Sequence, residues 1–336
     1  MRSPVPQPPR RLPALANTTE VWRRSWIAVA PAGEVPDNTP VQVLLGGDAW
    51  VLTRMDGVLT AFDDHCPHRQ SPLSAGSVTR AEDGSARLLC AFHGWCFDPA
   101  GQCDLMPDED RGHGGGHHHH HHRWHGKQAG HHRGADHGSG APAPRLLAAY
   151  GVVERYGLIW LAAEEPLAPL PEFPEWEGGP AGRAACQSRT VQASAGQVID
   201  GFLAAGDGWE AGEVTTHEWR VTGSFLAGSR DDARTIKTAG AHASVHLRLE
   251  RPDATIGILV TCQPEDWGTT RVYKLITHSG LAPGTAAMER FARAEDHALA
   301  RDLSATPAPG PASQAPGSLS LAWHRLMARA AGLSPS

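Results

Sequence analysis

The sequence predicts an α+β protein with two domains: an N-terminal antiparallel β domain and a C-terminal curved antiparallel sheet around a long helix. Short strand signals, separated by Pro, Gly and Asp-Gly turns, fill residues 20–106. A histidine-rich segment at 107–144 interrupts this pattern. Further strand patterns then precede a helical pattern at 284–303. A chain of 336 residues is long enough for two such domains.

The first domain is expected to cover residues 19–145. It follows a Pro/Arg-rich arm at 1–18, which lacks the apolar stretch of a signal peptide and is expected to be disordered. Strands are expected at SWIAVA, VQVLLG, AWVLTR and VLTAF. After the histidine-rich segment, regular structure is expected to resume with two strands in 145–161.

The segment at 107–144 holds 11 of the 20 histidines and almost no aliphatic side chains. Such a composition cannot bury enough surface to offset the entropy lost on ordering, so we expect a flexible loop inserted in the first domain. Its HHHHHH run would bind Ni²⁺, Cu²⁺ or Zn²⁺ loosely. Metal buffering is one interpretation, and low-complexity drift in a tolerant surface loop is the simpler one.

The second domain is expected to cover residues 146–336. A Pro-rich crossing at 166–174 leads to a helical pattern at 195–205. Strands are expected near 217–227, 242–250, 255–263 and 270–278, before the closing helix at 284–303 and a last short helix, LSLAWHRLMARAAG. This order fits a curved antiparallel sheet around a long C-terminal helix.

The composition excludes several classes of protein. With 40% hydrophobic residues, 20% charged residues and a net charge of −6, the chain has no electrostatic footprint for nucleic acid or an anionic membrane. No stretch approaches the roughly 18 apolar residues of a membrane span. Four of the six cysteines crowd into 66–103, which indicates metal in a reducing compartment and not a disulfide framework. We therefore expect a cytoplasmic protein.

Two short loops combine cysteine with histidine. The first is CPHR at 66–69 and the second is CAFHGW at 90–95, with 21 residues between His68 and Cys90. Each loop offers one thiolate and one imidazole, the set that a [2Fe–2S] cluster with two Cys on one iron and two His on the other needs. Cys66, His68, Cys90 and His93 are the predicted ligands. Structural zinc is the alternative, although zinc sites usually pair C-x₂-C with H-x₃₋₅-H.

The segments CPHRQSPLSAG and LLCAFHGWCFDPAGQC, followed by MP, resemble the N-terminal domain of the Rieske non-haem iron oxygenases, in their large terminal subunits. The resemblance covers roughly residues 20–106 and implies a [2Fe–2S] cluster on the four ligands above. Cys96 and Cys103 lie near the cluster and are expected to stay free, buried thiols. His65 is expected to be a turn residue and not a ligand.

The resemblance also implies a helix-grip fold for the second domain. In this family it holds a mononuclear Fe(II) on two histidines and one carboxylate. The histidines come from a helix with the pattern N-x-x-D-x-x-H-x₄-H, and VIDGFL within 195–215 resembles that helix. The polar residues of the family pattern are replaced in this sequence. Gly201 occupies the position of the Asn, Ala204 that of the Asp, Asp207 that of the first His, and Ala211 or Gly212 that of the second His.

The late helix keeps an acid on its apolar stripe. By resemblance, Asp296 in FARAEDHALARDL is the iron carboxylate, and a surface or capped Asp is the alternative. Other donors that could rebuild the site are Asp207, Glu213, His217, His242 and His246. A site of carboxylates alone would bind Fe(II) weakly, because imidazole matches this metal better. We therefore expect a degenerate or remodelled mononuclear iron site.

Three functions remain open on the sequence. The resemblance implies an oxygenase, a homotrimer that takes NAD(P)H electrons through a separate reductase or ferredoxin to hydroxylate or demethylate an aromatic or related small molecule. The partner is required because the chain has no Gly-rich dinucleotide fingerprint. The alternatives are a non-catalytic Rieske electron-transfer or binding protein, and a metal-handling protein that uses the histidine-rich loop.

Overall fold

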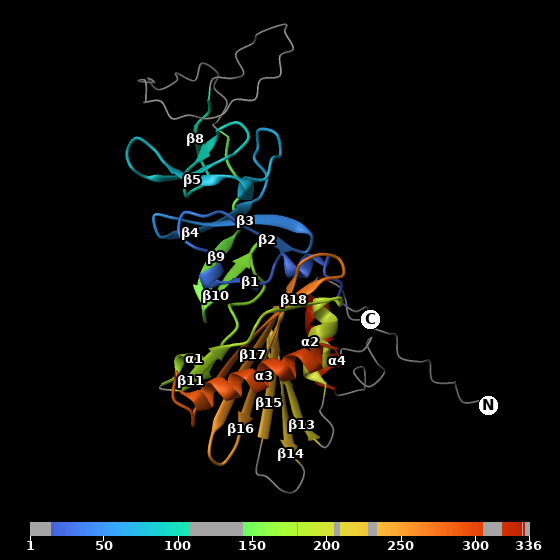
Figure 1. Ribbon diagram of the computed structural model, residues 1–336. Helices are drawn as coiled ribbons and strands as arrows, with labels where there is room; N and C mark the ends of the chain where they lie inside the picture. Colours follow the sequence, from blue (N-terminus) through green and yellow to red (C-terminus); the bar gives the residue numbers. More distant parts are fainter. Residues whose placement is uncertain are drawn as a thin grey trace, which may run out of the picture.

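The computed structural model describes residues 15–107, 144–179, 181–204, 209–227, 234–304, 318–330 and 332. Most of the predicted N-terminal arm and of the histidine-rich loop lies outside these residues, and so does Asp207. The strands of the first domain gather at one end of the molecule, and the large sheet with α3 lies at the other (Figure 1).

The N-terminal half contains three small antiparallel sheets. Their strand orders are β1-β10-β9, β2-β3-β4 and β5-β6-β7-β8. The strands are β1 (Ile27–Pro31), β2 (Val41–Leu45), β3 (Asp48–Met55), β4 (Val58–Asp63), β5 (Ser77–Arg80), β6 (Ala86–Leu89), β7 (Cys96–Phe97), β8 (Cys103–Leu105), β9 (Gly151–Arg155) and β10 (Leu158–Ala162). Short 3₁₀ helices cover Glu20–Trp22, Ala32–Glu34 and Leu73–Ala75.

Tight two-residue turns set the register of these hairpins. Gly46 and Gly47 join β2 to β3 with φ of 64° and 97°, and Asp56 and Gly57 join β3 to β4 with φ of 53° and 78°. Positive φ at both central residues matches the right-handed twist of the flanking strands. The Gly and Asp-Gly turn signals of the sequence therefore end these strands within one residue of the predicted positions.

The C-terminal half is built on one eight-stranded antiparallel sheet. Its strand order is β11-β18-β17-β16-β15-β14-β13, with β12 paired to β18 beside β11. The strands are β11 (Gly182–Ala185), β12 (Arg189–Val191), β13 (Trp209–Thr216), β14 (Arg220–Ala227), β15 (Arg234–Gly240), β16 (Ser244–Glu250), β17 (Thr255–Pro264) and β18 (Thr270–His278).

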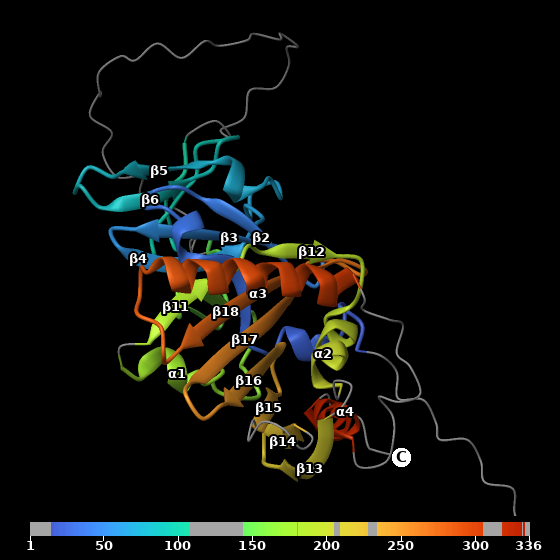
Figure 2. The same cartoon turned by 60° about the horizontal axis from the view of Figure 1, so that its bottom comes forward.

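Helices cover this sheet on both faces. They are α1 (Pro174–Glu177), α2 (Ala195–Leu203), α3 (Ala286–Ser304) and α4 (Leu319–Ala330). A capping box between Ser194 and Gln197 fixes the start of α2. The helices α2, α3 and α4 share one face, where α3 runs along the sheet (Figure 2). Among the described helices, none is both long and apolar enough to cross a membrane.

The strand β17 shows why the sheet is buried on both faces. Ile256, Ile258 and Val260 pack into the core under the helices, while Leu259 packs on the other face against Phe173. A strand buried on both faces is nearly continuously apolar, as the run TIGILVTC is. The face away from α2, α3 and α4 therefore carries α1 and the connection from the first domain.

The predicted α+β fold class is confirmed, with an N-terminal antiparallel β part and a curved sheet with a long helix. The sequence did not predict β13 as a separate strand, nor β15. The strands β9 and β10 pair with β1, so strand pairing in the N-terminal part continues to Ala162. The domain boundary at 145 stays a prediction.

Candidate metal centre

Two neighbouring turns present the cysteines and histidines of the first domain. In the first turn, the Gln70 N–H donates to the Cys66 carbonyl at 2.8 Å. In the second, the Cys90 N–H donates to the Trp95 carbonyl at 2.8 Å, and Gly94, at a φ of 71°, closes the loop. These backbone bonds fix the two turns on which the four candidate ligands lie.

The two thiols lie on the inner side of the site. Cys66 and Cys90 are each 1% exposed and belong to the same apolar cluster. Burial raises the pKa of Cys66 to about 11, and backbone N–H groups of His68 and Arg69 partly oppose that shift. A metal must therefore displace a proton from this thiol, and the same N–H groups then stabilise the thiolate sulfur.

The two imidazoles lie on the outer side. The His68 and His93 rings are half-buried, with centroids 4.6 Å apart in an edge-to-face arrangement. The Trp95 ring stacks on the other side of His68 at 4.8 Å with an interplanar angle of 6°. The stack limits how far the imidazole can turn, so Trp95 fixes the orientation of one candidate ligand.

Paired donors fit a two-iron cluster better than a single zinc ion. Within the described ranges, no three His, Cys, Asp or Glu side chains are grouped around one metal position. Two thiols on one side and two imidazoles on the other are the donor set of a Rieske [2Fe–2S] cluster. A tetrahedral zinc site would need all four donors around one point.

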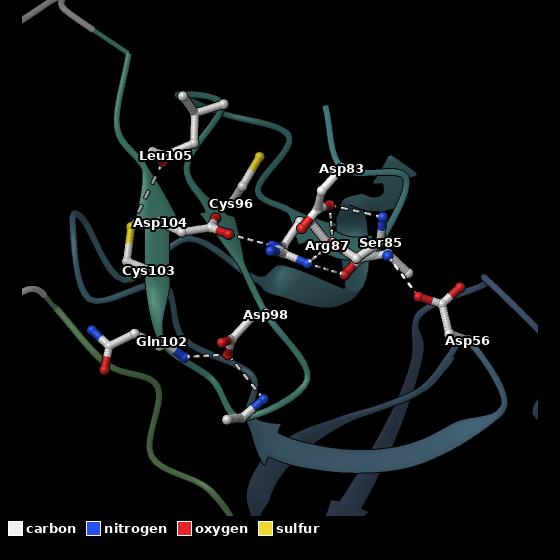
Figure 3. Close-up of polar contacts among 12 residues, drawn as sticks. Asp56, Asp83, Ser85, Arg87, Cys96, Asp98, Gln102, Cys103, Asp104 and Leu105 are labelled. Carbon is white, nitrogen blue, oxygen red and sulfur yellow. Dashed lines mark hydrogen bonds and ion pairs between the residues drawn. The ribbon is translucent and has the colours of Figure 1, made fainter. Parts of the chain in front are cut away.

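Polar contacts hold the small sheet beneath the second loop. Arg87 of β6 forms an ion pair with Asp104 of β8, and the Asp56 carboxylate accepts the Ala86 N–H at 2.8 Å (Figure 3). Asp98 accepts the N–H groups of Ala100 and Gln102 at the next turn. These bonds tie β6, β7 and β8 together, so the second loop has a rigid base.

The remaining residues of this region behave as the sequence indicates. Cys96 and Cys103 are free, buried thiols that point to the carbonyl oxygens of Gly94 and Leu105, each at 3.6 Å. His65 Nδ1 contacts the Asp63 carboxylate at 2.5 Å and is exposed. None of these three side chains belongs to the paired donor set.

The family comparison agrees with this geometry. Residues 25–125 match the model of the Rieske [2Fe-2S] domain. The chain carries a Rieske domain. Its resident cofactor is accordingly a [2Fe–2S] cluster.

Sequence relatives of the Rieske chain include several oxygenases. It is 32% identical over 180 residues to the 4beta-methylsterol monooxygenase of Methylococcus capsulatus, which covers 52% of this chain and 40% of the relative. It is 41% identical over 68 residues to the methylxanthine N3-demethylase NdmB of Pseudomonas putida, covering 20% of this chain and 19% of the relative. The chain thus matches less than half the length of these curated relatives.

Solved structures extend the likeness to both domains. NdmB of Pseudomonas putida aligns with a TM-score of 0.68 and 18% identity over 91% of this chain and 86% of that chain. Apo dicamba monooxygenase aligns with a TM-score of 0.66 and 18% identity over 93% of this chain and 97% of that chain. The Rieske chain therefore has the two-domain fold of the Rieske oxygenase large subunits.

Asp296, the predicted iron carboxylate of the second domain, lies on α3 but binds protein groups. Its Oδ2 accepts from Arg189 Nη2 at 2.7 Å, and its Oδ1 accepts the Gln187 N–H at 3.1 Å. The side chains of Arg189 and Asp296 are 31% and 25% exposed, so the ion pair is partly buried. The acid on the apolar stripe thus has a protein cation as its partner, which the sequence did not indicate.

The helix α2 ends before the second histidine position of the family pattern. Lys237 of β15 donates from Nζ to the carbonyl oxygens of Phe202 at 2.9 Å and Ala204 at 2.5 Å. Burial lowers the pKa of Lys237 to about 8. A cation suits the carbonyl end of a helix, and an ammonium group there opposes binding of a metal cation nearby.

A buried polar cluster on α2 was missed by sequence reasoning. Asp200 accepts from Ser320 Oγ at 2.5 Å and contacts His324 Nε2 at 2.8 Å, so it joins α2 to α4. The family pattern fits equally when it starts at Gln197, which puts Asp200 at the Asp position and Leu203 at the first His position. Gln197 carries a side-chain amide three residues before Asp200, as the Asn of the pattern does before its Asp, and this was the sequence signal for the second register. Neither register supplies an imidazole.

The other candidate donors are not brought to Asp296. His246 contacts Glu175 and His242 contacts Ser244, on the sheet face away from α3. His217 and Glu213 are exposed. The described residues therefore do not form a site for mononuclear iron, and the predicted ligand role of Asp296 stays a prediction.

Proposed function

We propose that the chain is the oxygenase component of a Rieske-type system, which hydroxylates or demethylates an aromatic or related small molecule. The observation that carries the proposal is the paired thiols and imidazoles of the Rieske domain, joined to a second domain with an oxygenase fold. The names of the relatives, a sterol monooxygenase and a methylxanthine demethylase, support O₂-dependent chemistry but differ in substrate.

The proposed ligands are Cys66 and Cys90 on one iron and His68 and His93 on the other. When bound, the cluster supplies reversible one-electron transfer at a potential raised by its neutral imidazole ligands. The protein excludes water from the thiols, which are fully buried, and leaves the imidazoles half-buried at the surface. An electron donor would therefore approach the histidine side.

The proposal includes partners that supply those electrons. A reductase or ferredoxin that draws on NAD(P)H is needed, because the chain has no dinucleotide fingerprint of its own. A homotrimer and a cytoplasmic location are further parts of the same proposal. The trimer rests on the resemblance to Rieske oxygenases, and size-exclusion chromatography with light scattering tests it. The location rests on the cysteines that crowd into 66–103, which indicate metal in a reducing compartment.

A second candidate function is an electron-transfer or binding protein without mononuclear iron. The ion pair between Asp296 and Arg189 favours it, because it neutralises the one acid that the family pattern assigns to iron. The described residues do not fit that metal, so no step of the proposed reaction is derived through it. The two candidates share the Rieske domain and differ only in the second domain.

Iron content per chain separates the candidates after anaerobic reconstitution with iron and sulfide. Close to three irons supports the oxygenase, and close to two supports the electron-transfer protein. A colourless protein that takes up only zinc rejects both. Cys66→Ser should lose the visible absorption of the cluster, whereas the matched control Cys186→Ser, a thiol in the second domain, should keep it.

A further inference from the structure

A cavity of about 280 Å³ lies on the face of the large sheet opposite α2, α3 and α4. Its floor is formed by β14, β15 and β16, and its outer wall is the connection around Leu170 and Pro171. Asp296, Asp200 and Lys237 face the other side of the sheet or its helices, whereas the candidate donors His242 and His246 line the cavity. The cavity is therefore separate from the region where the family pattern places iron.

One wall of the cavity is organised by Glu175, whose side chain is 8% exposed. It contacts His246 Nε2 at 2.9 Å and accepts from Arg248 Nη1 at 2.8 Å. A Cβ at Gly257 would come within 2.9 Å of the Glu175 Cβ, so glycine is needed for the carboxylate to sit here. The buried carboxylate therefore fixes an imidazole and a guanidinium in the wall of the cavity.

Hydroxyl groups line the floor beside this network. Thr222 and Thr238 pair across β14 and β15, and their Oγ1 atoms lie 3.1 Å apart. This contact uses one of the two hydroxyl hydrogens. Ser244 Oγ lies 2.6 Å from Nδ1 of His242, and burial lowers the pKa of His242 to about 4, so this imidazole is neutral. The floor thus offers short polar groups with no charge of their own.

The mouth of the cavity combines a cation with an apolar wall. Arg220 Nη1 donates to Glu172 at 3.2 Å, but both side chains are exposed, at 41% and 69%. An exposed pair of this kind contributes about 0–1 kcal/mol, so a ligand anion can replace Glu172 at small cost. Trp219 and Leu170 supply apolar surface beside the guanidinium. An anion attached to a flat ring matches that pair of surfaces.

We propose that this cavity binds a small aromatic carboxylate. The carboxylate takes the place of Glu172 at Arg220 and accepts a hydrogen bond from a threonine hydroxyl, and the ring packs on Trp219 and Leu170. A volume of 280 Å³ is near the lower end of ligand pockets, which selects a single-ring compound. The site goes beyond the proposed oxygenase function, because it requires neither the cluster nor mononuclear iron.

Isothermal titration of the cluster-loaded full chain with benzoate tests the site, with benzamide and acetate as matched probes. Benzoate should bind at least about tenfold more tightly than either, since benzamide lacks the charge and acetate lacks the ring. Arg220→Gln and Trp219→Leu should each weaken benzoate binding by about tenfold, because each removes one of the two matched surfaces. The exposed Arg290→Gln on α3 is the charge-matched control and should leave it unchanged.

Three results would overturn the assignment. One is benzoate binding that survives both substitutions, which would place the ligand elsewhere, including the helix side of the sheet. Another is equal affinity for benzoate and benzamide. The third is no heat of binding for benzoate at millimolar concentration while circular dichroism shows a folded chain.

Discussion

Arg189 of β12 holds the Asp296 carboxylate of α3 at 2.7 Å, although 107 residues separate them in the chain. The carboxylate also accepts the Gln187 N–H, so both of its oxygens are used by protein groups. The pair ties the long helix to the edge of the sheet. An acid that the family pattern assigns to iron is therefore a structural partner in this chain.

Removing the arginine should destabilise the second domain. Arg189→Met leaves a partly buried carboxylate without its cation, and we expect a loss of about 1–2 kcal/mol, between values for surface and buried pairs. The urea midpoint of the full chain measures this loss. Arg290→Gln, an exposed change on the same helix as Asp296, should shift the midpoint by less than about 0.5 kcal/mol.

Asp296→Asn distinguishes a structural role from a metal-binding one. If the ion pair is the whole role of Asp296, the substitution lowers stability and leaves the iron content of the chain unchanged. A fall in iron content by one atom per chain, with the cluster absorption intact, would instead make Asp296 an iron ligand.

The stack between Trp95 and His68 should affect retention of the cluster. Trp95→Leu removes an aromatic contact worth about 0.5–1.5 kcal/mol, so the cluster should bleach in air about threefold to tenfold faster. The decay of visible absorption measures the rate. Trp267→Leu, at a ring that is 83% exposed, is the control and should leave the bleaching rate unchanged. An unchanged rate in Trp95→Leu would mean that Trp95 does not orient His68.

Glu175 should make the stability of the chain depend on pH in acid. Burial alone would raise its pKa, but the hydrogen bond and charge of His246 and the bond from Arg248 outweigh burial and lower the pKa from 4.5 to about 2. Because the folded pKa is lowered, the ionised Glu175 stabilises the folded chain above pH 4.5. This stabilisation, about 2 kcal/mol of unfolding free energy, is lost as the pH falls from 4.5 towards 2.

Glu175→Gln should therefore lose stability at pH 6 and show a shallower decline in acid than the natural chain. Chemical denaturation from pH 6 to pH 3 measures both. Parallel curves for the two chains across that interval would mean that Glu175 is not held as a carboxylate by its neighbours.

The buried Asp200 should be required for the docking of α4. Asp200→Ala leaves Ser320 and His324 without their shared acceptor, at a cost of about 3 kcal/mol. Hydrogen exchange should show early opening of Leu319–Ala330 in this variant. Asp253→Ala at an exposed turn is the control, and protection of α4 equal to that of the natural chain would contradict the role.

Local chemistry explains what the sequence predicted of the fold. Turns such as Asp56-Gly57 require positive φ, so the residue types alone mark the strand ends, whatever the rest of the fold. The strand β15 was not predicted, because Lys237 breaks the alternation on the buried face, where it caps α2 instead of facing water. Its role depends on a helix 34 residues earlier, at Leu203, and no local pattern shows such a contact.

The candidate site divides in the same way. Cys66, His68, Cys90 and His93 were predicted because each loop carries its own spacing, which is local information. The partners of Asp296 and Asp200 could not be predicted, because they depend on strand register and on helix packing over more than 100 residues. A sequence pattern can show an acid in an unusual place, but only the fold shows whether a metal ion or a protein cation neutralises its charge.

Pulsed EPR of the reduced protein counts the nitrogen ligands of the cluster and so tests the assignment of His68 and His93. We expect two strongly coupled imidazole nitrogens on a reduced [2Fe–2S] centre, one of which disappears in His93→Cys. A reduced centre with no coupled nitrogen, or a protein with no paramagnetic centre that retains only zinc, would contradict this assignment.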